Sequence, residues 1–224
     1  MRRIKLYDTT LRDGAQSEGI TYSLVDKERI AEKLDYLGID YIEGGWPSSN
    51  PKDMQFFRRM LKKKLRHARL VGFGSTRRAG ITAGRDKNLQ GILKSQARYI
   101  TLFGKTWPLH VKHVLRTNLE ENLRMISDSV RFLVKRNLVV FYDAEHFFDA
   151  YQENPGYALD CLRAAWEAGA GFLVLCDTNG GALPQQISRV IREIKPKLDI
   201  GLGIHCHNDS GLAIANTLLA VEAG

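Results

Sequence analysis

Short apolar segments alternate along this chain with longer segments whose hydrophobic positions repeat every three to four residues. The short segments are rich in β-branched and aromatic residues, as strands are, whereas the longer ones have the period of amphipathic helices. This alternation is typical of βαβ units, in which helices connect parallel strands. We predict strands at residues 4–8, 41–44, 69–73, 99–103, 139–143, 172–177 and 201–205.

The longer segments predict helices between and after these strands. The expected helices cover residues 24–37, 53–64, 87–94, 119–135, 157–168, 183–194 and 211–223. Gly38 and Gly169 follow two of them, and glycine commonly ends a helix because it adopts a left-handed backbone without steric cost. We expect a positive φ at both glycines.

Polar clusters at the strand ends indicate how the strands are arranged. Parallel strands joined by helices form either an open doubly wound sheet or a closed eight-stranded barrel. A barrel gathers the carboxyl ends of all its strands around one face, whereas an open sheet binds its ligand at a single switch point. Here the polar clusters begin at Asp8, Glu43, Gly74, Gly104, Asp143, Asp177 and His205. Because they follow all seven strands, we predict an α/β fold, the TIM (β/α)8 barrel.

The length of the chain bears on how much of that barrel is present. A complete barrel typically needs about 250 residues, and the 224 residues here contain about seven βα units. No linker, internal repeat or low-complexity segment divides the chain. We therefore expect one catalytic barrel domain over residues 1–224 that is incomplete at its C-terminus, with open edges on the first and seventh strands.

The charge of the chain raises the alternative of a basic nucleic-acid-binding protein. Thirty-three Lys and Arg residues against 25 Asp and Glu give a formal net charge of +8, which suits an anionic partner. Much of the excess lies in one stretch, at Arg58, Arg59, Lys62, Lys63, Lys64, Arg66 and Arg69. This stretch lacks the interleaved aromatic residues of a single-strand binding surface and is more typical of a solvated helix face. We predict no nucleic-acid partner.

The cysteines and the N-terminus bear on the compartment. Cys161, Cys176 and Cys206 have no CxxC spacing, which argues against a disulfide framework and a zinc ribbon. None belongs to the constellation of a base and an orienting group that a nucleophilic cysteine needs. The chain also lacks a signal-peptide pattern and an apolar run of membrane-spanning length. These features predict a cytoplasmic protein with no membrane association.

Two segments carry residues suited to a metal ion. His205 and His207 are two residues apart at a strand end, so both imidazoles lie on one side of the extended chain. Asp13 follows the first strand, where an ion pair with Arg12 is the simpler interpretation of that residue alone. In a barrel, however, the first and seventh strand ends face the same mouth. Two imidazoles and a carboxylate suit a divalent metal that chelates a keto acid, and Zn, Mn, Mg and Co all remain candidates.

The same segments resemble a known enzyme superfamily. Residues 8–16 (DTTLRDGAQ) together with residues 205–213 (HCHNDSGLA) resemble the DRE-TIM metallolyases. These include isopropylmalate, homocitrate and citramalate synthases and hydroxymethylglutaryl-CoA lyase. Three further stretches are similar to the citramalate-synthase branch, at residues 103–111 (FGKTWPLHV), 142–149 (YDAEHFFD) and 174–181 (VLCDTNGG). The resemblance spans the whole chain.

The resemblance implies a metal site and further parts of the protein. Asp13, His205 and His207 would bind the metal, and an asparagine after the eighth strand would complete the ligand set. That asparagine and a C-terminal regulatory domain would lie beyond Gly224. The family also implies a homodimer of the full-length protein.

The resemblance further implies a reaction and residue roles. The expected reaction condenses acetyl-CoA with pyruvate to give citramalate and CoA, a step of isoleucine and leucine biosynthesis. Removing a methyl proton from the acetyl thioester develops an enolate, whose charge Arg12 is suited to stabilise. Glu145 resembles a glutamate that acts near the acetyl group, as part of the base. The residues expected to contact substrate are Arg12, Gln16, Glu43, Asp143 and Thr178.

Three alternatives within and outside this chemistry stay open. A different 2-keto acid would make the enzyme an isopropylmalate or homocitrate synthase, since one pocket methyl group changes such a choice by about 1–3 kcal/mol. A carbon–carbon lyase of the hydroxymethylglutaryl-CoA type would need a loop cysteine near the mouth. The nucleic-acid-binding alternative leaves the paired metal motifs unexplained. Histidines 67, 110, 113 and 146 lack a comparable set of partners, and we expect them to be structural or surface residues.

Overall fold

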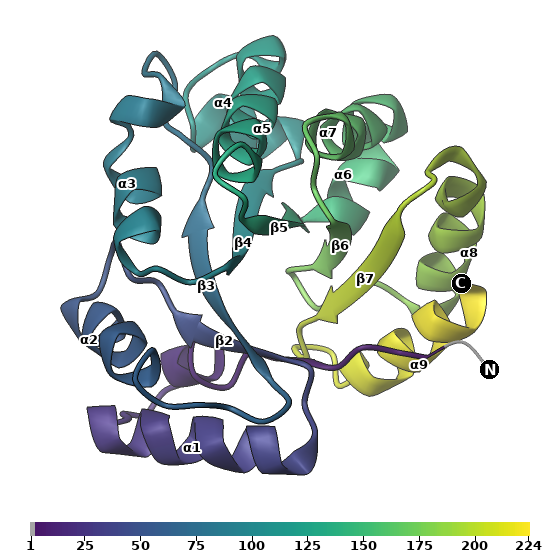
Figure 1. Cartoon of the computed structure of the whole chain (residues 1–224). Coiled ribbons are helices and arrows are strands. Elements are labelled where there is room, and N and C mark those ends of the chain that lie inside the picture. The colour runs from purple at the N-terminus through teal and green to yellow at the C-terminus, as the bar shows by residue number, and fades with distance from the viewer. Residues whose placement is uncertain (1–2) are drawn as a thin grey trace. The chain divides into compact units, whose positions relative to one another are not determined.

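The computed structural model describes residues 3–224, which fall into two compact units. The first unit comprises the chain up to Ser75 together with Gly84–Thr101, and the second comprises Thr76–Ala83 and Leu102–Gly224. Figure 1 shows strands and helices alternating from the purple to the yellow end of the chain. The seven strands follow one another in the sheet in chain order, β1 to β7. The predicted strand number and alternation are confirmed, while the one-domain organisation stays a prediction.

The first unit holds the first three strands, the start of the fourth and three α-helices. Its strands are β1 (Tyr7–Asp8), β2 (Tyr41–Gly45), β3 (Arg69–Ser75) and the first three residues of β4 (Tyr99–Lys105). Its helices are α1 (Leu24–Leu37), α2 (Pro51–Met60) and α3 (Lys87–Lys94), with a 3₁₀ turn at η1 (Gly14–Gln16). A second 3₁₀ turn, η2 (Ala83–Arg85), begins with the last residue of a second-unit segment and continues into this unit. β1 pairs with β2, and β2 with β3, both in parallel.

Local sequence explains where helices of the first unit begin and how closely they pack. Ser23 and Asp26 form a capping box at the start of α1, and Gly38 ends the helix with φ 85°, as predicted. Gly44 of β2 lies under α2, since a Cβ there would come 2.6 Å from the ring of Phe56. Absence of a side chain at this position therefore lets α2 pack directly on the strand.

The second unit holds the rest of β4 and three further strands. These are β5 (Val139–Glu145), β6 (Phe172–Asp177) and β7 (Gly201–Cys206), each parallel to its neighbour. Its helical elements are α4 (Pro108–His113), α5 (Leu119–Val134), α6 (Phe147–Glu153), α7 (Pro155–Glu167), α8 (Pro184–Ile194), η3 (Lys195–Lys197) and α9 (Ala213–Ala223). Gly169 has φ 101°, as expected after α7. The core consists of fully buried aliphatic and aromatic side chains such as Val140, Tyr142 and Leu173.

Among the boundary predictions that were wrong, two have an identifiable reason, at the starts of β1 and α2. The first strand was predicted at residues 4–8 but is formed only by Tyr7 and Asp8, because the N–H of Leu6 donates to the Asp40 side chain instead of a neighbouring strand. The helix predicted at residues 53–64 begins at Pro51 and ends at Met60. Asn50 caps its start by accepting from the N–H of Lys52, an Asn-Pro signal that the prediction overlooked.

The prediction also missed two short helices and the full length of three strands. α4 and α6 have only six and seven residues, too few to produce a clear helical period. β3, β4 and β5 extend two residues further than predicted, to Ser75, Lys105 and Glu145. Glu145 is therefore the last residue of a strand and not part of a loop. Among residues 3–224, no helix is both long and apolar enough to cross a membrane.

Candidate functional site

Arg12 is held in one orientation by groups of the first unit. The carbonyl of Thr9 accepts the N–H groups of Arg12 and Asp13 at 3.1 and 2.8 Å, which forms a tight turn after β1. Arg12 Nε donates to Glu43 Oε1 at 2.6 Å, and its Nη1 lies 3.3 Å from Asp13 Oδ1. The guanidinium carbon lies 3.8 Å from the ring centroid of Phe73. These contacts fix the plane of the guanidinium.

Glu43 is a buried carboxylate with both oxygens engaged. It is 0% exposed, and its second oxygen accepts the hydroxyl of Tyr7 at 2.6 Å. Tyr7 also lies 2.7 Å from the hydroxyl of Thr101. Since the Tyr7 proton goes to Glu43, the Thr101 hydroxyl donates to Tyr7. Glu43 thus holds Arg12 in place, and its contact with a substrate stays a prediction.

Asp13 and Gln16 lie at the two ends of the short 3₁₀ turn η1. Asp13 precedes the turn, its side chain is 20% exposed, and its carbonyl accepts the N–H of Gln16 at 2.9 Å. Gln16 is exposed. The Asp13 carboxylate therefore has the solvent access that a metal ligand requires, and the Arg12 guanidinium is its neighbour.

His205 and His207 form a pair of imidazoles at the end of β7 in the second unit. Their ring centroids are 5.1 Å apart, with planes at 69°, and both side chains are partly exposed. The backbone N–H of His207 donates to the carbonyl of Asp177 at 3.1 Å. The end of β7 is thereby anchored to the end of β6.

The turn after β6 interlocks with the turn that contains His207. Asp177 is 2% exposed and accepts the N–H of Ala182 at 3.3 Å, while Asn216 Nδ2 donates to the Ala182 carbonyl at 2.8 Å. Burial raises the pKa of the Asp177 carboxyl above its ordinary value, although backbone hydrogen bonds work against this. Gly180, with φ 59°, lies so close to Asp209 that a Cβ would come 2.7 Å from its carboxylate.

Glu145 and Thr178 are connected at the ends of β5 and β6. The Glu145 carboxylate forms an ion pair with the ammonium of Lys105, and its carbonyl accepts the Thr106 hydroxyl. The N–H of the next residue, His146, donates to Thr178 Oγ1 at 2.9 Å. Asp143 is two residues before Glu145 on the same strand, so both side chains lie on the same face.

Sequence reasoning missed several residues of this cluster. His110 and His146 were expected to be structural or surface residues, which stays a prediction; the His146 side chain is 12% exposed, and its Nδ1 lies 3.1 Å from Asp149 Oδ2. Lys105, Thr106 and Asn179 belong to the predicted polar clusters at the strand ends but were given no role of their own. The spacing of three residues between His146 and Asp149 was the available signal, since it places two side chains within reach on one helical turn.

The donor atoms of three predicted residues suit a divalent metal. Among residues 3–224, Asp13 in the first unit and His205 and His207 in the second are the candidate ligands, and all three side chains are partly exposed. Imidazole nitrogens with one carboxylate oxygen suit zinc and the other first-row divalent metals. The residues present therefore fit such an ion.

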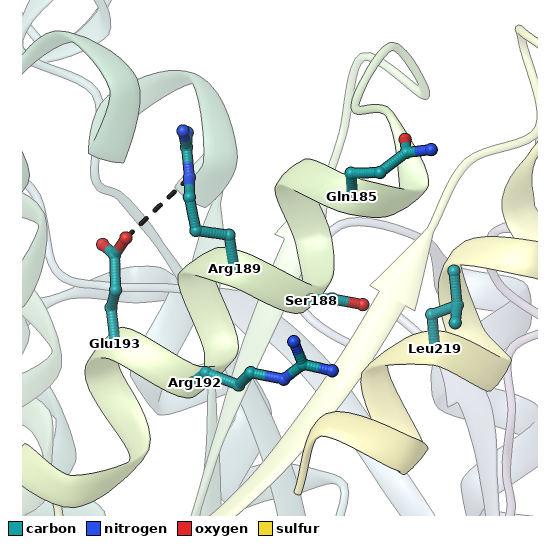
Figure 2. A pocket seen from close by; sticks show the side chains of 6 residues that line it. All are labelled: Gln185, Ser188, Arg189, Arg192, Glu193 and Leu219. Atoms are coloured by element: carbon teal, nitrogen blue, oxygen red, sulfur yellow. Dashed lines mark ion pairs between the residues drawn. The ribbon is translucent and has the colours of Figure 1, made fainter.

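A surface depression in the second unit is lined by none of these residues. It has a volume of about 520 Å³ and lies between α8 and α9, as Figure 2 shows. The lining side chains are Gln185, Ser188, Arg189, Arg192, Glu193 and Leu219. Arg189 and Glu193 form an ion pair of 3.8 Å across one turn of α8. No predicted site residue lines this depression, so we do not assign the chemistry to it.

Comparisons with known proteins identify relatives of the whole chain. The model of the HMGL-like family matches residues 3–224. The chain is 53% identical over 224 residues to an (R)-citramalate synthase of Geobacter sulfurreducens and 32% identical over 222 residues to a 2-isopropylmalate synthase of Methanocaldococcus jannaschii. These alignments cover 100% and 99% of this chain but only 42% and 40% of the two relatives. The chain thus spans less than half the length of these two curated relatives.

A solved structure supports the predicted fold class. The hydroxymethylglutaryl-CoA lyase of Pseudomonas aeruginosa superposes with a TM-score of 0.81 over 99% of this chain and 74% of that one, at 17% sequence identity. This likeness concerns the fold alone. The prediction of a TIM-type (β/α) barrel with seven of its βα units is confirmed.

Proposed function

This chain belongs to the HMGL-like family, and from that membership we propose that it forms the catalytic barrel of a citramalate synthase. The protein would condense acetyl-CoA with pyruvate to give citramalate and CoA. The observation that carries the proposal is the 53% identity to an (R)-citramalate synthase over all 224 residues. Identity to a 2-isopropylmalate synthase is lower, at 32%.

The proposed metal site consists of Asp13, His205 and His207. In a barrel these residues belong to the ends of the first and seventh strands, and their donor atoms suit Zn, Mn, Mg or Co. A bound divalent ion would act as a Lewis acid on the keto group of the acceptor. The interlocked turns after β6 and β7 support this proposal, because they fix the backbone of His207 through Asp177.

Arg12 would stabilise negative charge that develops during the condensation. The enolate of the acetyl thioester and the alkoxide of the product both carry charge that the substrates lack. Glu43, Asp13 and Phe73 hold the guanidinium before any substrate binds. Such a preorganised cation needs no reorientation during the reaction, which is the main source of electrostatic catalysis.

Glu145 would take the methyl proton of the acetyl group, or belong to the group that does. Its carboxylate is the last side chain of β5 and forms an ion pair with the ammonium of Lys105. Thr178, which is connected to Glu145 through His146, would bind the keto acid. We also propose substrate contacts for Gln16 and Asp143.

An acyl-acceptor screen tests the function. Release of CoA from acetyl-CoA is followed with a thiol reagent in the presence of pyruvate, 2-oxoisovalerate or 2-oxoglutarate, and without any keto acid as a control. We expect kcat/KM for pyruvate to exceed that for 2-oxoisovalerate by about 10-fold or more, since the two acceptors differ by two methyl groups. Preference for another keto acid would assign the protein to the isopropylmalate or homocitrate synthases. Absence of CoA release with every acceptor would contradict the reaction class.

The state of the whole protein is also a proposal. We propose a homodimer in the cytoplasm that binds small-molecule substrates and neither nucleic acid nor membranes. Sedimentation of the protein at micromolar concentration tests the dimer directly. A monomer under these conditions would contradict that part of the proposal.

A further inference from the structure

The three stretches that resemble citramalate synthases meet at one residue of the second unit, His146. Residues 103–111 contribute Trp107 and His110, whose rings lie 5.7 and 4.5 Å from that of His146. Residues 174–181 contribute Thr178, whose hydroxyl accepts the N–H of His146 at 2.9 Å. Residues 142–149 contain His146 itself and its partner Asp149. One residue thus connects the ends of β4, β5 and β6.

The backbone of His146 is in an unusual conformation. Its φ of 57° and ψ of 37° lie in the left-handed region, which residues other than glycine seldom occupy. Such a conformation persists only where the surrounding structure over-determines it, and it concentrates at functional sites. Here the peptide group between Glu145 and His146 makes a hydrogen bond at each of its two ends. The carbonyl of Glu145 accepts from Thr106, and the N–H of His146 donates to Thr178.

The side chain of His146 is the first member of a hydrogen-bonded chain. Its Nδ1 lies 3.1 Å from Asp149 Oδ2, and Asn179 Nδ2 donates to the same carboxylate oxygen at 3.0 Å. Although burial works to raise the pKa of Asp149, the hydrogen bonds from His146 and Asn179 hold it below its ordinary value. An ionised Asp149 favours a proton on Nδ1 of His146 and so fixes the orientation of the ring.

His110 completes the packing around the ring. The two imidazoles meet edge to face at 85°, and Trp107 lies 4.9 Å from His110. Burial, and then the neighbouring His146, lower the pKa of His110, which favours its neutral form. A neutral His110 ring can pack here without placing a positive charge beside His146.

We propose that His146 is a positioning residue of the condensation, which holds Glu145 and Thr178 at a fixed separation through its left-handed backbone and its contact with Asp149. The inference rests on the proposed function, because it gives those two residues their roles. A simple helix cap is the alternative, since His146 precedes α6. However, the His146 side chain makes no capping hydrogen bond to the helix backbone. Its partner is a carboxylate that Asn179 of the next strand end also binds.

Substitutions distinguish a positioning role of His146 in catalysis from a role in folding alone. His146→Ala removes the ring and disfavours the left-handed backbone, and we expect kcat to fall by about 10- to 100-fold with KM values within about threefold, as displaced catalytic groups produce. His146→Asn should keep kcat within about threefold of the wild type, because asparagine tolerates the left-handed region and its amide can donate to Asp149. Asn179→Ala should lower kcat several-fold. His113→Ala, at an exposed histidine of α4, is the matched control.

Steady-state kinetics and the melting temperature of each variant test the positioning role of His146. Wild-type kcat in His146→Ala would overturn the inference, as would equal losses of kcat in the alanine and asparagine variants. If His146→Ala does not fold, Asn179→Ala decides, and wild-type kcat in that variant would overturn it. A wild-type protein that forms no citramalate would instead contradict the proposed function, and with it the premise of this inference.

Discussion

At the scale of single residues, the buried carboxylate of Glu43 in the first unit holds the guanidinium of Arg12. Glu43 is buried, and Arg12 and Tyr7 occupy its two oxygens. Removing one member of such a buried pair leaves an uncompensated charge, which costs about 3–5 kcal/mol. We therefore regard Glu43 as the support of Arg12, and changes to Glu43 should affect stability and turnover together.

Replacing Arg12 with lysine should preserve the fold and remove most of the turnover. A lysine ammonium is a point charge that cannot bond Glu43 and Asp13 in the fork geometry of a guanidinium or stack on Phe73 in the same way. We expect kcat for citramalate formation to fall by about 100-fold, the effect of losing one preorganised donor. The matched control is Arg136→Lys, which replaces an arginine stacked on Phe132 outside the site. Turnover of Arg12→Lys within about threefold of that control would reduce Arg12 to an orienting role.

Sequence reasoning found residues whose type and spacing were informative. His205 and His207 were predicted because imidazoles two residues apart on a strand share one side, and their ring distance of 5.1 Å agrees with this. Asp13 was predicted because the first and seventh strand ends of a barrel face the same mouth. The hydrogen bonds that hold Glu43 in place could not be predicted. Tyr7 donates to Glu43 and is itself bonded to Thr101, which is 94 residues from Tyr7 in the chain. Only the fold brings such residues together, and neither has a distinctive motif of its own.

At the scale of elements, the turns after β6 and β7 pack so closely that one position admits only glycine. Gly180→Ala would place a Cβ 2.9 Å from the N of Asp209 and 3.0 Å from the carbonyl oxygen of His207, at a positive φ. We expect a loss of stability of about 1–3 kcal/mol and weaker metal binding, because His207 must shift. Gly181→Ala is the control, since a Cβ added there would meet no atom within 4 Å. Chemical denaturation and metal titration compare the two variants, and equal behaviour would show that the turns are not interlocked.

A second element-scale prediction concerns acid stability in the second unit. Glu121, in the first turn of α5, accepts from buried Arg77 at 2.7 Å and from Arg124 at 2.9 Å. These bonds lower the pKa of Glu121 from 4.5 to about 2. A lowered carboxyl pKa contributes stability that is complete above the unfolded-state pKa and is lost as the pH falls through the folded-state pKa. The contribution of Glu121 should therefore disappear between pH 4.5 and about 2.

Denaturation midpoints of the wild type and Glu121→Gln measure this contribution. The two proteins should differ at pH 6 and converge as the pH approaches 2, where the wild-type carboxyl is protonated. Glu120→Gln serves as the control, because Glu120 is adjacent on the same helix but 79% exposed, and an exposed ion pair contributes little to stability. A constant difference between wild type and Glu121→Gln over this range would assign the residue no titrating role.

Helix prediction succeeded where the chain itself carries the end signals. α1 and α3 have the predicted bounds, and both have side-chain caps at their starts, from Ser23 and Asp86. α6 was missed because it begins after the left-handed His146, where no common helix-start residue marks the boundary. The conformation of His146 depends on Thr178 and Asp149, so the local sequence could not reveal it.

At the scale of the whole molecule, part of the positive charge in the basic stretch is paired with glutamates of a neighbouring helix. Arg59 and Lys63 of the basic stretch form ion pairs of 2.8 and 2.9 Å with Glu28, and Lys63 also pairs with Glu32 at 2.7 Å. Both glutamates belong to α1 of the same unit. This arrangement favours the interpretation as a solvated helix surface, while the lack of a nucleic-acid partner stays a prediction.

The barrel class was predictable from the order of elements, because strands that alternate with helices and each end in polar residues suit few architectures. The division into two compact units was not predictable, since it follows from the packing of nonlocal segments and no linker marks it. β4 belongs to both units, with Tyr99–Thr101 in one and the rest in the other. A continuous strand leaves no compositional boundary in the sequence.

The metal site provides the prediction that involves both units. If one ion binds Asp13, His205 and His207 together, it stabilises the folded protein by about 2.7 kcal/mol when its free concentration is about 100 times its Kd. Adding Zn, Mn, Mg or Co to chelator-treated protein should raise the melting temperature for at least one metal, and both Asp13→Asn and His207→Ala should lose most of that increase. His113→Ala, at an exposed histidine, should keep it. If Asp13→Asn retained the full increase while His207→Ala lost it, the ion would bind the β7 histidines without Asp13, and the ligand set inferred from the two signatures would be wrong.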